Sequence, residues 1–220
     1  MSIVVVGTDT DVGKTLVSAS ILARYARSVR LAYWKPVATG GQDGDTASVE
    51  RWVGDRVDVL PSTYSFEPPV SPHLAARKAK VAIEPDRICA ELVEHGLAHE
   101  DRSLVIEGIG GVLVPLNDHG YLWVHLMRDM CLPCVLVARS IVGTINHTLL
   151  SLAALRKERV EVAGVILSGP KNKDNKEAIE RFGDVPVLAE LDRIPRVGKK
   201  GLADAAKKFD RRARLRSLLV

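Results

Sequence analysis

The sequence predicts an α/β fold, a mostly parallel β-sheet with helices on both faces. Short apolar runs rich in Val, Ile and Leu alternate along the chain with segments of helical periodicity. Strands that are apolar throughout are typical of parallel sheets that helices cover on both sides. Hydrophobic residues make up 46% and charged residues 26% of the 220 positions, an ordinary globular composition. We expect a single domain over residues 1–220.

Six apolar runs are expected to form the strands: "IVVV" (3–6), "RLAYWK" (30–35), "SLVIEG" (103–108), "CVLVA" (134–138), "VAGVILS" (162–168) and "PVLAEL" (186–191). Between them, "KTLVSASILARYAR" (14–27) has helical periodicity, "TASVERWV" (46–53) suits a helix, and helices are expected to fill 85–98, 144–157, 173–182 and 202–218. The Pro-rich stretch 61–73 is the longest irregular segment, and long loops in compact domains are often functional.

Neither a membrane nor an export signal is expected. No apolar stretch is long enough to span a bilayer, and the N-terminal "MSIVVVGTD" lacks the basic region and the apolar length of a signal peptide. We therefore expect a cytoplasmic protein. Cys131 and Cys134 form "CLPC", but Cys134 opens an apolar strand and the chain has no second Cys pair. The two cysteines are therefore expected to pack in the core rather than to serve redox or zinc chemistry, and Cys89 is the third cysteine of the chain.

The positive charge is concentrated near the C-terminus. Residues 196–216 hold nine Lys or Arg and two Asp, whereas the whole chain has a net charge of +4. This segment either contacts nucleic acid or acidic lipid, or it closes the domain as an amphipathic helix with Leu202, Ala206, Phe209 and Ala213 on its apolar face. The helix is favoured, and no nucleic-acid partner is expected, because no aromatic interleaving accompanies the charge.

The stretch "GTDTDVGKT", residues 7–15, predicts a phosphate-binding loop. It matches G-x-x-x-x-G-K-[ST], and it follows a strand and precedes a helix, as the mechanism requires. The glycines let successive backbone N–H groups face one anion, and the helix N-terminus adds its positive dipole end. Lys14 supplies a charge to the outer phosphates, and the Thr15 hydroxyl supplies a ligand for Mg²⁺. The fold is therefore expected to be of the P-loop NTPase type.

Three further residues narrow the chemistry, and two of them, Lys35 and Asp45, also have a simpler interpretation. Lys35 ends a strand, where it either binds a transferring phosphoryl group or is an ordinary solvated lysine. Glu107 ends an apolar strand, where a carboxylate is costly to bury without a cation, so a Mg²⁺ ligand is the economical interpretation. Asp45 either caps a helix or completes the metal shell.

Taken together, these segments resemble the dethiobiotin synthetase family of biotin biosynthesis. The resemblance covers the phosphate loop, "KPVATG" (35–40), "YSFEPPVSPH" (64–73), "VIEGIGGVLVPL" (105–116) and "GTINHTLL" (143–150), in the order found in that family. The last three segments are more specific than the phosphate loop, and beyond residue 150 the resemblance thins.

The resemblance implies an ATP- and Mg²⁺-dependent ligase. Its substrates would be 7,8-diaminopelargonic acid, CO₂ or bicarbonate, and ATP. A substrate amine takes up CO₂ as a carbamate, ATP phosphorylates the carbamate, and the second amine closes a cyclic urea. Because every reacting species is anionic, the site needs cations and N–H donors.

Carried over residue by residue, the resemblance assigns most of the site. Thr10 and Lys14 hold phosphates and stabilise the transferring group, and Lys35, helped by Thr39, binds the carbamate and the γ-phosphate. Thr15, Asp45 and Glu107 hold Mg²⁺. The nucleotide is expected to contact Thr8, Asp9, Thr10, Asp11, Val12, Gly13, Lys14, Thr15, Glu107, Gly110, Ser168, Gly169, Glu190, Leu191 and Asp192.

The family also implies a homodimer. The turn Gly143, Thr144, Ile145 and Asn146 would take the distant substrate carboxylate from the other subunit, and it opens an expected helix whose N–H groups suit an anion. For Asn146 and His147 alone, a plain helix start is an equally good interpretation. His73 and His147 are expected to make structural hydrogen bonds and not to act as bases.

The base site departs from the family pattern. Ser168-Gly169 stands where members commonly read adenine with Asn-Asp, and a hydroxyl cannot replace an amide's donor and acceptor pair. Selection for adenine should weaken, so that other nucleoside triphosphates also serve. "AELDRIP" (189–195), which departs as well, is expected to form the other wall of the base pocket.

Two other functions fit parts of the sequence. One is another P-loop ATPase, an amidotransferase-type ligase or a partitioning or metal-chaperone ATPase, but these often carry an extra Lys early in the loop, where this chain has Thr8 and Asp9. The other is a nucleotide-dependent regulator that holds nucleic acid with its basic C-terminal segment. A salt-dependent DNA-binding assay separates the second from the ligase.

Overall fold

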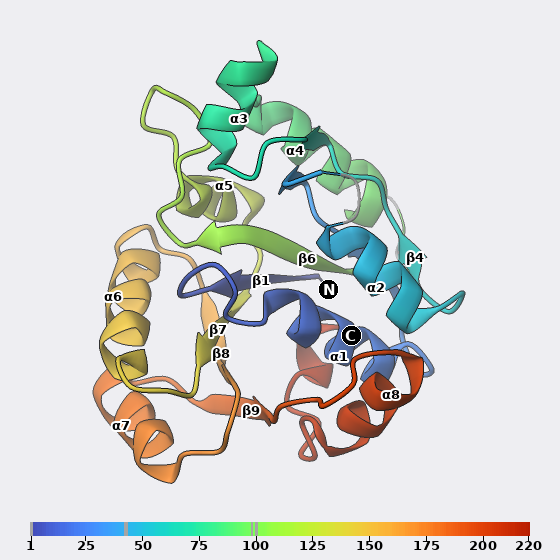
Figure 1. Ribbon diagram of the computed structural model, residues 1–220, viewed down its shortest axis with the longest axis vertical. Helices are drawn as coiled ribbons and strands as arrows, with labels where there is room; N and C mark the ends of the chain where they lie inside the picture. Colours follow the sequence, from blue (N-terminus) through green and yellow to red (C-terminus); the bar gives the residue numbers. More distant parts are fainter. Residues whose placement is uncertain (1, 42–43, 98, 100) are drawn as a thin grey trace.

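A seven-stranded parallel sheet with helices on both faces forms the centre of the protein in a computed structural model, which describes residues 2–41, 44–97, 99 and 101–220 (Figure 1). The strand order is β4-β2-β6-β1-β7-β8-β9, and every pair is parallel. These strands are β1 (Ile3–Gly7), β2 (Arg30–Trp34), β4 (Asp58–Val59), β6 (Arg102–Gly111), β7 (Cys134–Arg139), β8 (Val162–Ser168) and β9 (Val187–Leu191). The predicted fold class is confirmed.

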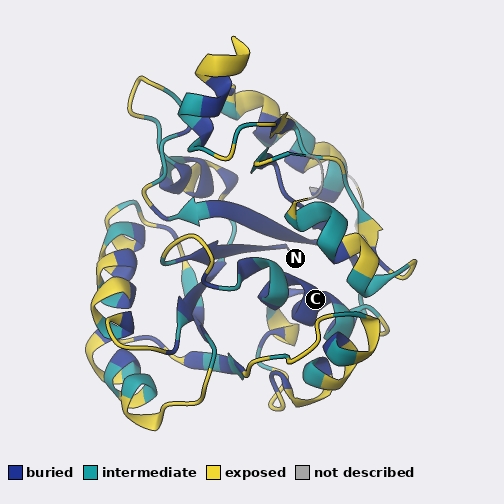
Figure 2. Cartoon of the chain, viewed as in Figure 1, coloured by how far each residue is buried: buried dark blue, intermediate teal, exposed yellow. Residues whose placement is uncertain are grey.

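The helices bury their apolar faces on opposite sides of the sheet. One side carries α1 (Lys14–Tyr25), α2 (Asp45–Val53) and α8 (Lys199–Lys208), whose apolar side chains share one core cluster. The other carries α3 (Pro72–Ala79), α4 (Pro85–Leu92), α5 (Trp123–Met130), α6 (Thr144–Lys157) and α7 (Lys173–Gly183). Figure 2 shows the strands as the most continuously buried part of the chain, as expected for a sheet covered on both sides.

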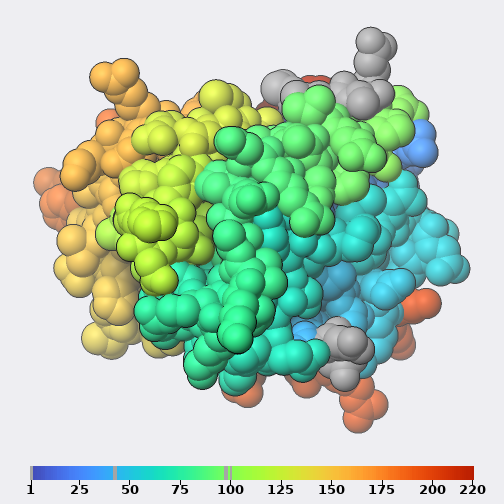
Figure 3. Space-filling view, turned by 90° about the horizontal axis from the view of Figure 1, so that it is seen from above, coloured from blue at the N-terminus to red at the C-terminus, as the bar shows by residue number. Residues whose placement is uncertain are grey.

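Several elements differ from the sequence-based expectations. The expected helix 85–98 ends as α4 at Leu92 and continues as a π-helical turn, Val93–Leu97, while residue 98 lies outside the described residues. The expected irregular stretch 61–73 contains β5 (Tyr64–Phe66), which pairs with β3 (Val37–Thr39) in a small second sheet, and the first turn of α3. Seen from above (Figure 3), this region lies beside residues 112–121, to which His73 N donates a hydrogen bond at Pro115 O.

The basic C-terminal segment is helical over only half of its expected length. α8 ends at Lys208, and Asp210 and Ala213 adopt positive φ before a short 3₁₀ turn, Arg216–Leu218. Leu202, Ala206 and Phe209 are buried as expected, but Ala213 is exposed. Asp210 explains the break, because its buried carboxylate accepts from Tyr25 Oη at 2.5 Å and from two backbone amides, Arg214 N and Leu215 N. No helix in the described ranges is long and apolar enough to cross a membrane.

Candidate functional site

The loop between β1 and α1 wraps tightly around its own backbone. A Cβ on Gly7 would lie 2.7 Å from Val12 Cγ2 and 2.8 Å from Asp9 O, so that position requires glycine. Gly13 precedes α1 in the left-handed region with φ of 97°, and Asp11 also has positive φ. The loop therefore directs backbone amides towards the N-terminus of α1, as expected of a phosphate site.

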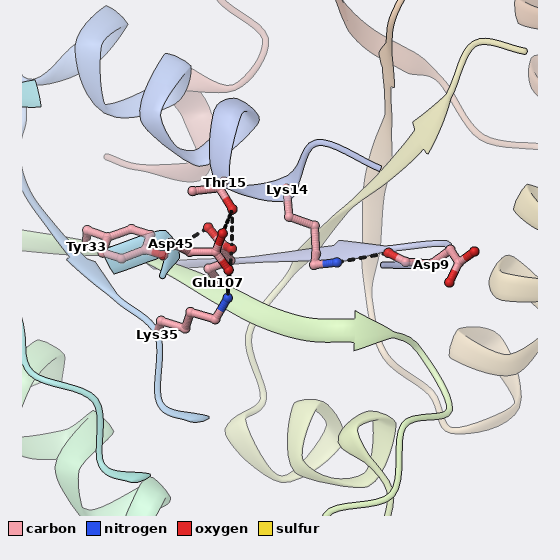
Figure 4. A network of polar contacts seen from close by, with 7 residues as sticks. All are labelled: Asp9, Lys14, Thr15, Tyr33, Lys35, Asp45 and Glu107. Atoms are coloured by element: carbon pink, nitrogen blue, oxygen red, sulfur yellow. Dashed lines mark hydrogen bonds and ion pairs between the residues drawn. The ribbon is translucent and has the colours of Figure 1, made fainter. Parts of the chain in front are cut away.

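Lys14 is a buried cation without a carboxylate partner. Its Nζ donates to Asp9 O at 2.9 Å, and it makes no ion pair within the described part of the chain. Burial lowers the pKa of the Lys14 ammonium, although the charge of Glu107 opposes this. Figure 4 shows its side chain turned along the loop towards Asp9. An anion placed in the loop would therefore be strongly favoured by Lys14.

Lys35 joins the two carboxylates that the sequence singled out. Its Nζ lies 3.2 Å from Glu107 Oε1 and forms a second ion pair with Asp45 Oδ2. Thr15 Oγ1 lies 2.7 Å from Asp45 Oδ1 and 2.8 Å from Glu107 Oε1 (Figure 4). Residues from α1, α2, β6 and the end of β2 therefore meet at one point.

This cluster fixes the charge of its members. Burial alone would lower the pKa of Lys35, but the charges of Glu107 and Asp45 outweigh it and raise that pKa. Burial would raise the pKa of Asp45, but Lys35 and the hydrogen bond from Thr15 lower it. Lys35 and Asp45 are thus both charged at neutral pH.

The oxygen atoms of the cluster suit a hard divalent cation. The Thr15 hydroxyl has one hydrogen and therefore donates to only one of its two close carboxylate neighbours. Three oxygens from Thr15, Asp45 and Glu107 gathered in this way match the ligands that Mg²⁺ prefers, with the remaining positions left to water and phosphate. No group of three or more His, Cys, Asp or Glu side chains in the described residues forms a complete protein cage for a metal.

The cluster opens into a cavity of about 710 Å³. Its lining includes Thr10, Lys14, Lys35, Thr39 and Gly110, and the described loop over residues 69–72 closes one side. The structure thus brings the predicted phosphate, metal and carbamate residues to one place, and the buried carboxylate of Glu107 contacts both Thr15 and Lys35 beside it. Thr8 and Val12 lie in the loop itself, outside the lining.

The predicted base-site residues fall into two groups. Glu190, Leu191 and Asp192 line a second cavity of about 950 Å³ beside α8. Ser168 instead lies against the phosphate loop, since a Cβ on Gly13 would be 2.6 Å from Ser168 Oγ. Gly169 follows with its N–H bonded to Leu191 O, which ties the two predicted walls together.

The turn predicted to hold the substrate carboxylate lies at the start of α6, outside the lining of both cavities. Gly143 and Asn146 are exposed, Thr144 is buried and Ile145 is half-buried. The buried hydroxyls of Ser140 and Thr144 have no hydrogen-bond partner among the described residues. Within one chain, therefore, this turn is separate from the Lys35 cluster.

The expectation of structural hydrogen bonds from two histidine side chains is wrong for the described chain. The buried Nδ1 of His73 has no partner, and only the backbone N–H groups of His73 and His147 are bonded, to Pro115 O and Gly143 O. The backbone bond from His73 N to Pro115 O ties the first turn of α3 to the segment after β6.

The cysteines are all free thiols. Cys134 is buried, and burial raises its pKa to about 12, as expected for core packing. Cys131 is exposed and Cys89 is half-buried, so the expectation of core packing is wrong for Cys131. Cys131 ends α5 with positive φ, which turns its side chain outward.

Two residues at the site escaped sequence reasoning. Tyr33 donates from its hydroxyl to Glu107 Oε2 at 3.0 Å, and Arg139 Nη2 lies 3.1 Å from Asp9 Oδ2. Tyr33 lies in β2 two residues before Lys35, which directly follows that strand, so strand alternation could have placed both on one face. Arg139 gave no signal beyond ending an apolar strand.

Comparison with known proteins identifies the family. The AAA_26 family, described as an AAA domain, matches residues 1–200. A protein of Paramagnetospirillum magneticum named ATP-dependent dethiobiotin synthetase BioD is 45% identical over 194 residues, which are 88% of each chain. A protein of the same name from Agrobacterium fabrum is 38% identical over 204 residues, covering 92% of this chain and 91% of the relative.

Solved structures of other P-loop ATPases share the fold. The Aquifex aeolicus MinC:MinD cell division protein complex aligns with a TM-score of 0.60 and 14% identity, covering 94% of this chain and 93% of that one. The Chlorobium tepidum ParA family ATPase aligns with a TM-score of 0.58 and 12% identity, covering 93% and 97%. These structural similarities show the fold alone, whereas the sequence identities to the two synthetases show the family. The chain belongs to the dethiobiotin synthetase family.

Proposed function

We propose that residues 1–220 act as one P-loop ligase domain that makes dethiobiotin from 7,8-diaminopelargonic acid, CO₂ or bicarbonate, and ATP. The observation that carries this proposal is the meeting of Lys14, Thr15, Lys35 and Asp45 around one cavity, with Glu107 bonded to two of them. Such a cluster suits a reaction whose every intermediate is anionic. Family membership supports the same reaction.

In this proposal Thr15, Asp45 and Glu107 hold Mg²⁺. When bound, the cation neutralises phosphate charge and orients the triphosphate for transfer. Lys14 meets the outer phosphates from the loop, and Thr10 contributes a hydroxyl at the same cavity. The buried, unpaired state of Lys14 supports its role, because a phosphate would compensate its charge.

Carboxylation and phosphoryl transfer come first. A substrate amine attacks the carbon of CO₂ and loses a proton, which gives a carbamate. A carbamate oxygen then attacks the γ-phosphorus of ATP, the bond to the bridging oxygen breaks, and ADP leaves. Lys35 holds the carbamate and the γ-phosphate with help from the Thr39 hydroxyl. The positive charge of Lys35 stabilises the negative charge that develops during transfer.

Ring closure completes the reaction. The second amine attacks the carbonyl carbon of the carbamic-phosphoric anhydride, the C–O bond to phosphate breaks, and phosphate leaves with the cyclic urea formed. The attacking nitrogen loses a proton, and since phosphate is itself a base, no histidine is required. The chain's contribution is to hold the two amines and the anhydride in contact.

The distant carboxylate of the substrate binds at α6 of a second subunit in a homodimer. Gly143, Thr144, Ile145 and Asn146 form the turn, and the first-turn amides of Ile145 and Asn146 have no intrahelical acceptor. The unpartnered buried hydroxyls of Ser140 and Thr144 support an anion there. The position of this turn outside the Lys35 cavity supports a contribution from another subunit.

The nucleotide base would lie between Ser168-Gly169 and Glu190-Leu191-Asp192. Ser168 packs on Gly13, so its hydroxyl is near the phosphates, and both charged and apolar side chains line the cavity on the other side. We expect ATP to be used and CTP or GTP to compete with it more effectively than at a pocket with an Asn amide.

The test is direct. The purified chain is incubated with diaminopelargonate, ¹³C-bicarbonate, Mg²⁺ and ATP, and dethiobiotin carrying one ¹³C is sought by mass spectrometry. Lys35→Gln should abolish product while leaving nucleotide binding largely intact, and Lys207→Gln, which removes an exposed lysine on α8, should be active. ATP hydrolysis without labelled product in the unsubstituted chain would refute the proposed reaction.

A further inference from the structure

A buried tyrosine supports the carboxylate at the centre of the site. Tyr33 is fully buried, and its hydroxyl donates to Glu107 Oε2 at 3.0 Å. The other oxygen, Oε1, faces Thr15 and Lys35 at 2.8 and 3.2 Å. The two oxygens of Glu107 therefore have different partners, and Tyr33 holds the one that faces away from the cluster (Figure 4).

The sheet places Tyr33 there by its register. Tyr33 of β2 is paired with Val105 of β6, and both side chains belong to the core cluster on the α1 side of the sheet. Glu107 stands two residues after Val105 and therefore on the same face. This diagonal arrangement across two parallel strands is within reach of an aromatic side chain.

The proton of the Tyr33 hydroxyl points to Glu107, because a carboxylate oxygen can only accept this hydrogen bond. Burial and the charge of Glu107 hold the pKa of Tyr33 well above its usual value, so it is a neutral donor under all working conditions.

We infer that Tyr33 is a positioning residue that holds Glu107 so that Oε1 is presented to a divalent cation beside Thr15. The inference rests on the proposed metal site. Partners that orient metal ligands in this way commonly change metal affinity by about 10- to 100-fold when they are removed. Tyr33→Phe removes the hydroxyl and keeps the ring that fills the core.

The experiment measures Mn²⁺ affinity by electron paramagnetic resonance in the presence of a β,γ-imido ATP analogue. Tyr33→Phe should weaken Mn²⁺ binding by about tenfold or more. It should also raise the Mg²⁺ concentration needed for half-maximal turnover, with kcat recovering at high Mg²⁺. Affinity for the nucleotide without metal should stay unchanged.

A matched control is available in the same helix layer. Tyr25 is also a buried tyrosine that donates to a carboxylate, Asp210, but at the far end of α1. Tyr25→Phe, like Tyr33→Phe, should lower the free energy of unfolding. Unlike Tyr33→Phe, it should leave Mn²⁺ affinity unchanged. A loss of Mn²⁺ affinity of equal size in both variants would overturn the inference, because it would reflect general destabilisation.

Glu107→Gln separates this inference from the proposed function. If Glu107→Gln weakens Mn²⁺ binding and Tyr33→Phe adds no further loss in that background, the coupling is as inferred. If Glu107→Gln weakens binding and Tyr33→Phe alone does not, the role of Tyr33 is refuted and the metal site stands. If Glu107→Gln binds Mn²⁺ like the unsubstituted chain, the metal site is refuted and Tyr33 with it.

Discussion

Replacing Lys35 by Gln should destabilise the protein as well as stop turnover. The Lys35 side chain is 7% exposed and that of Glu107 is 0% exposed, with Nζ and Oε1 3.2 Å apart. Removing one partner from such a buried pair costs roughly 3–5 kcal/mol. The Asp45 side chain is 44% exposed, so its pairing with Lys35 adds little. Because Tyr33 and Thr15 still bond Glu107, we expect a loss of about 3 kcal/mol, at the lower end of that range.

The loss should follow pH in a defined way. The pKa of Lys35 is raised above 10.5, so its contribution to stability is present below 10.5 and is lost as pH rises through the folded value. The pKa of Asp45 is lowered from 3.8, so its contribution is present above 3.8 and is lost as pH falls through the folded value. The difference in unfolding free energy between Lys35→Gln and the unsubstituted protein should therefore be constant between these limits. It should shrink strongly at higher pH and only slightly at lower pH, because the Asp45 pairing adds little.

The measurement is urea unfolding in EDTA at several pH values, followed by circular dichroism. Lys207→Gln is the control, because it removes a lysine whose ion pair with Asp204 is exposed, and its curve should match the unsubstituted protein. Mg²⁺ with a nucleotide should narrow the gap for Lys35→Gln, since a cation again neutralises the carboxylates. Superimposable unfolding curves for Lys35→Gln and Lys207→Gln at pH 7 would refute the argument.

Three further outcomes are expected. Gly13→Ala should abolish binding of a fluorescent nucleotide and cost at least about 1 kcal/mol in urea unfolding, because φ there is 97° and the new Cβ would meet Ser168 Oγ at 2.6 Å; unchanged nucleotide affinity would contradict this. Iodoacetamide at pH 8 should modify exposed Cys131 but not Cys134, whose pKa is about 12, and a disulfide between them would contradict the assignment. If the chain forms the proposed homodimer, Val142→Glu should yield monomers in sedimentation, since Val142 is fully exposed beside the turn proposed to contact the second subunit; dimers that persist would move the interface elsewhere.

The parts of the fold that follow from local pattern were predictable. Wholly apolar runs located six of the seven strands of the main sheet, and the glycine spacing located the phosphate loop. β4 (Asp58–Val59) is only two residues long and has no pattern to detect. No helix was predicted over α5 (Trp123–Met130), which is only eight residues long.

The candidate site was predictable as a set of residues but not as a network. Strand ends indicated that Lys35 and Glu107 would lie close together, and they do. The prediction that Glu107 ends its strand is wrong, because β6 continues to Gly111. The contacts of Asp45 with Thr15 and Lys35 depend on how α2 packs, which the sequence pattern does not specify. Tyr33 was hidden because a tyrosine in a strand is ordinarily a core residue, and only the β2–β6 register shows what its hydroxyl reaches.

The position of β1 in the middle of the sheet has a consequence for how the chain folds. β1 pairs only with β6 and β7, whose first residues are Arg102 and Cys134. A fragment that stops before Cys134 lacks one neighbour of this strand and leaves an apolar backbone edge open to aggregation. β1 is far in sequence from both of its partner strands, so the entropy of closing these long loops is lost before strand pairing lowers the free energy. Folding should therefore be slow compared with that of helical proteins of equal size. Truncations intended to isolate the phosphate loop should therefore extend through β7.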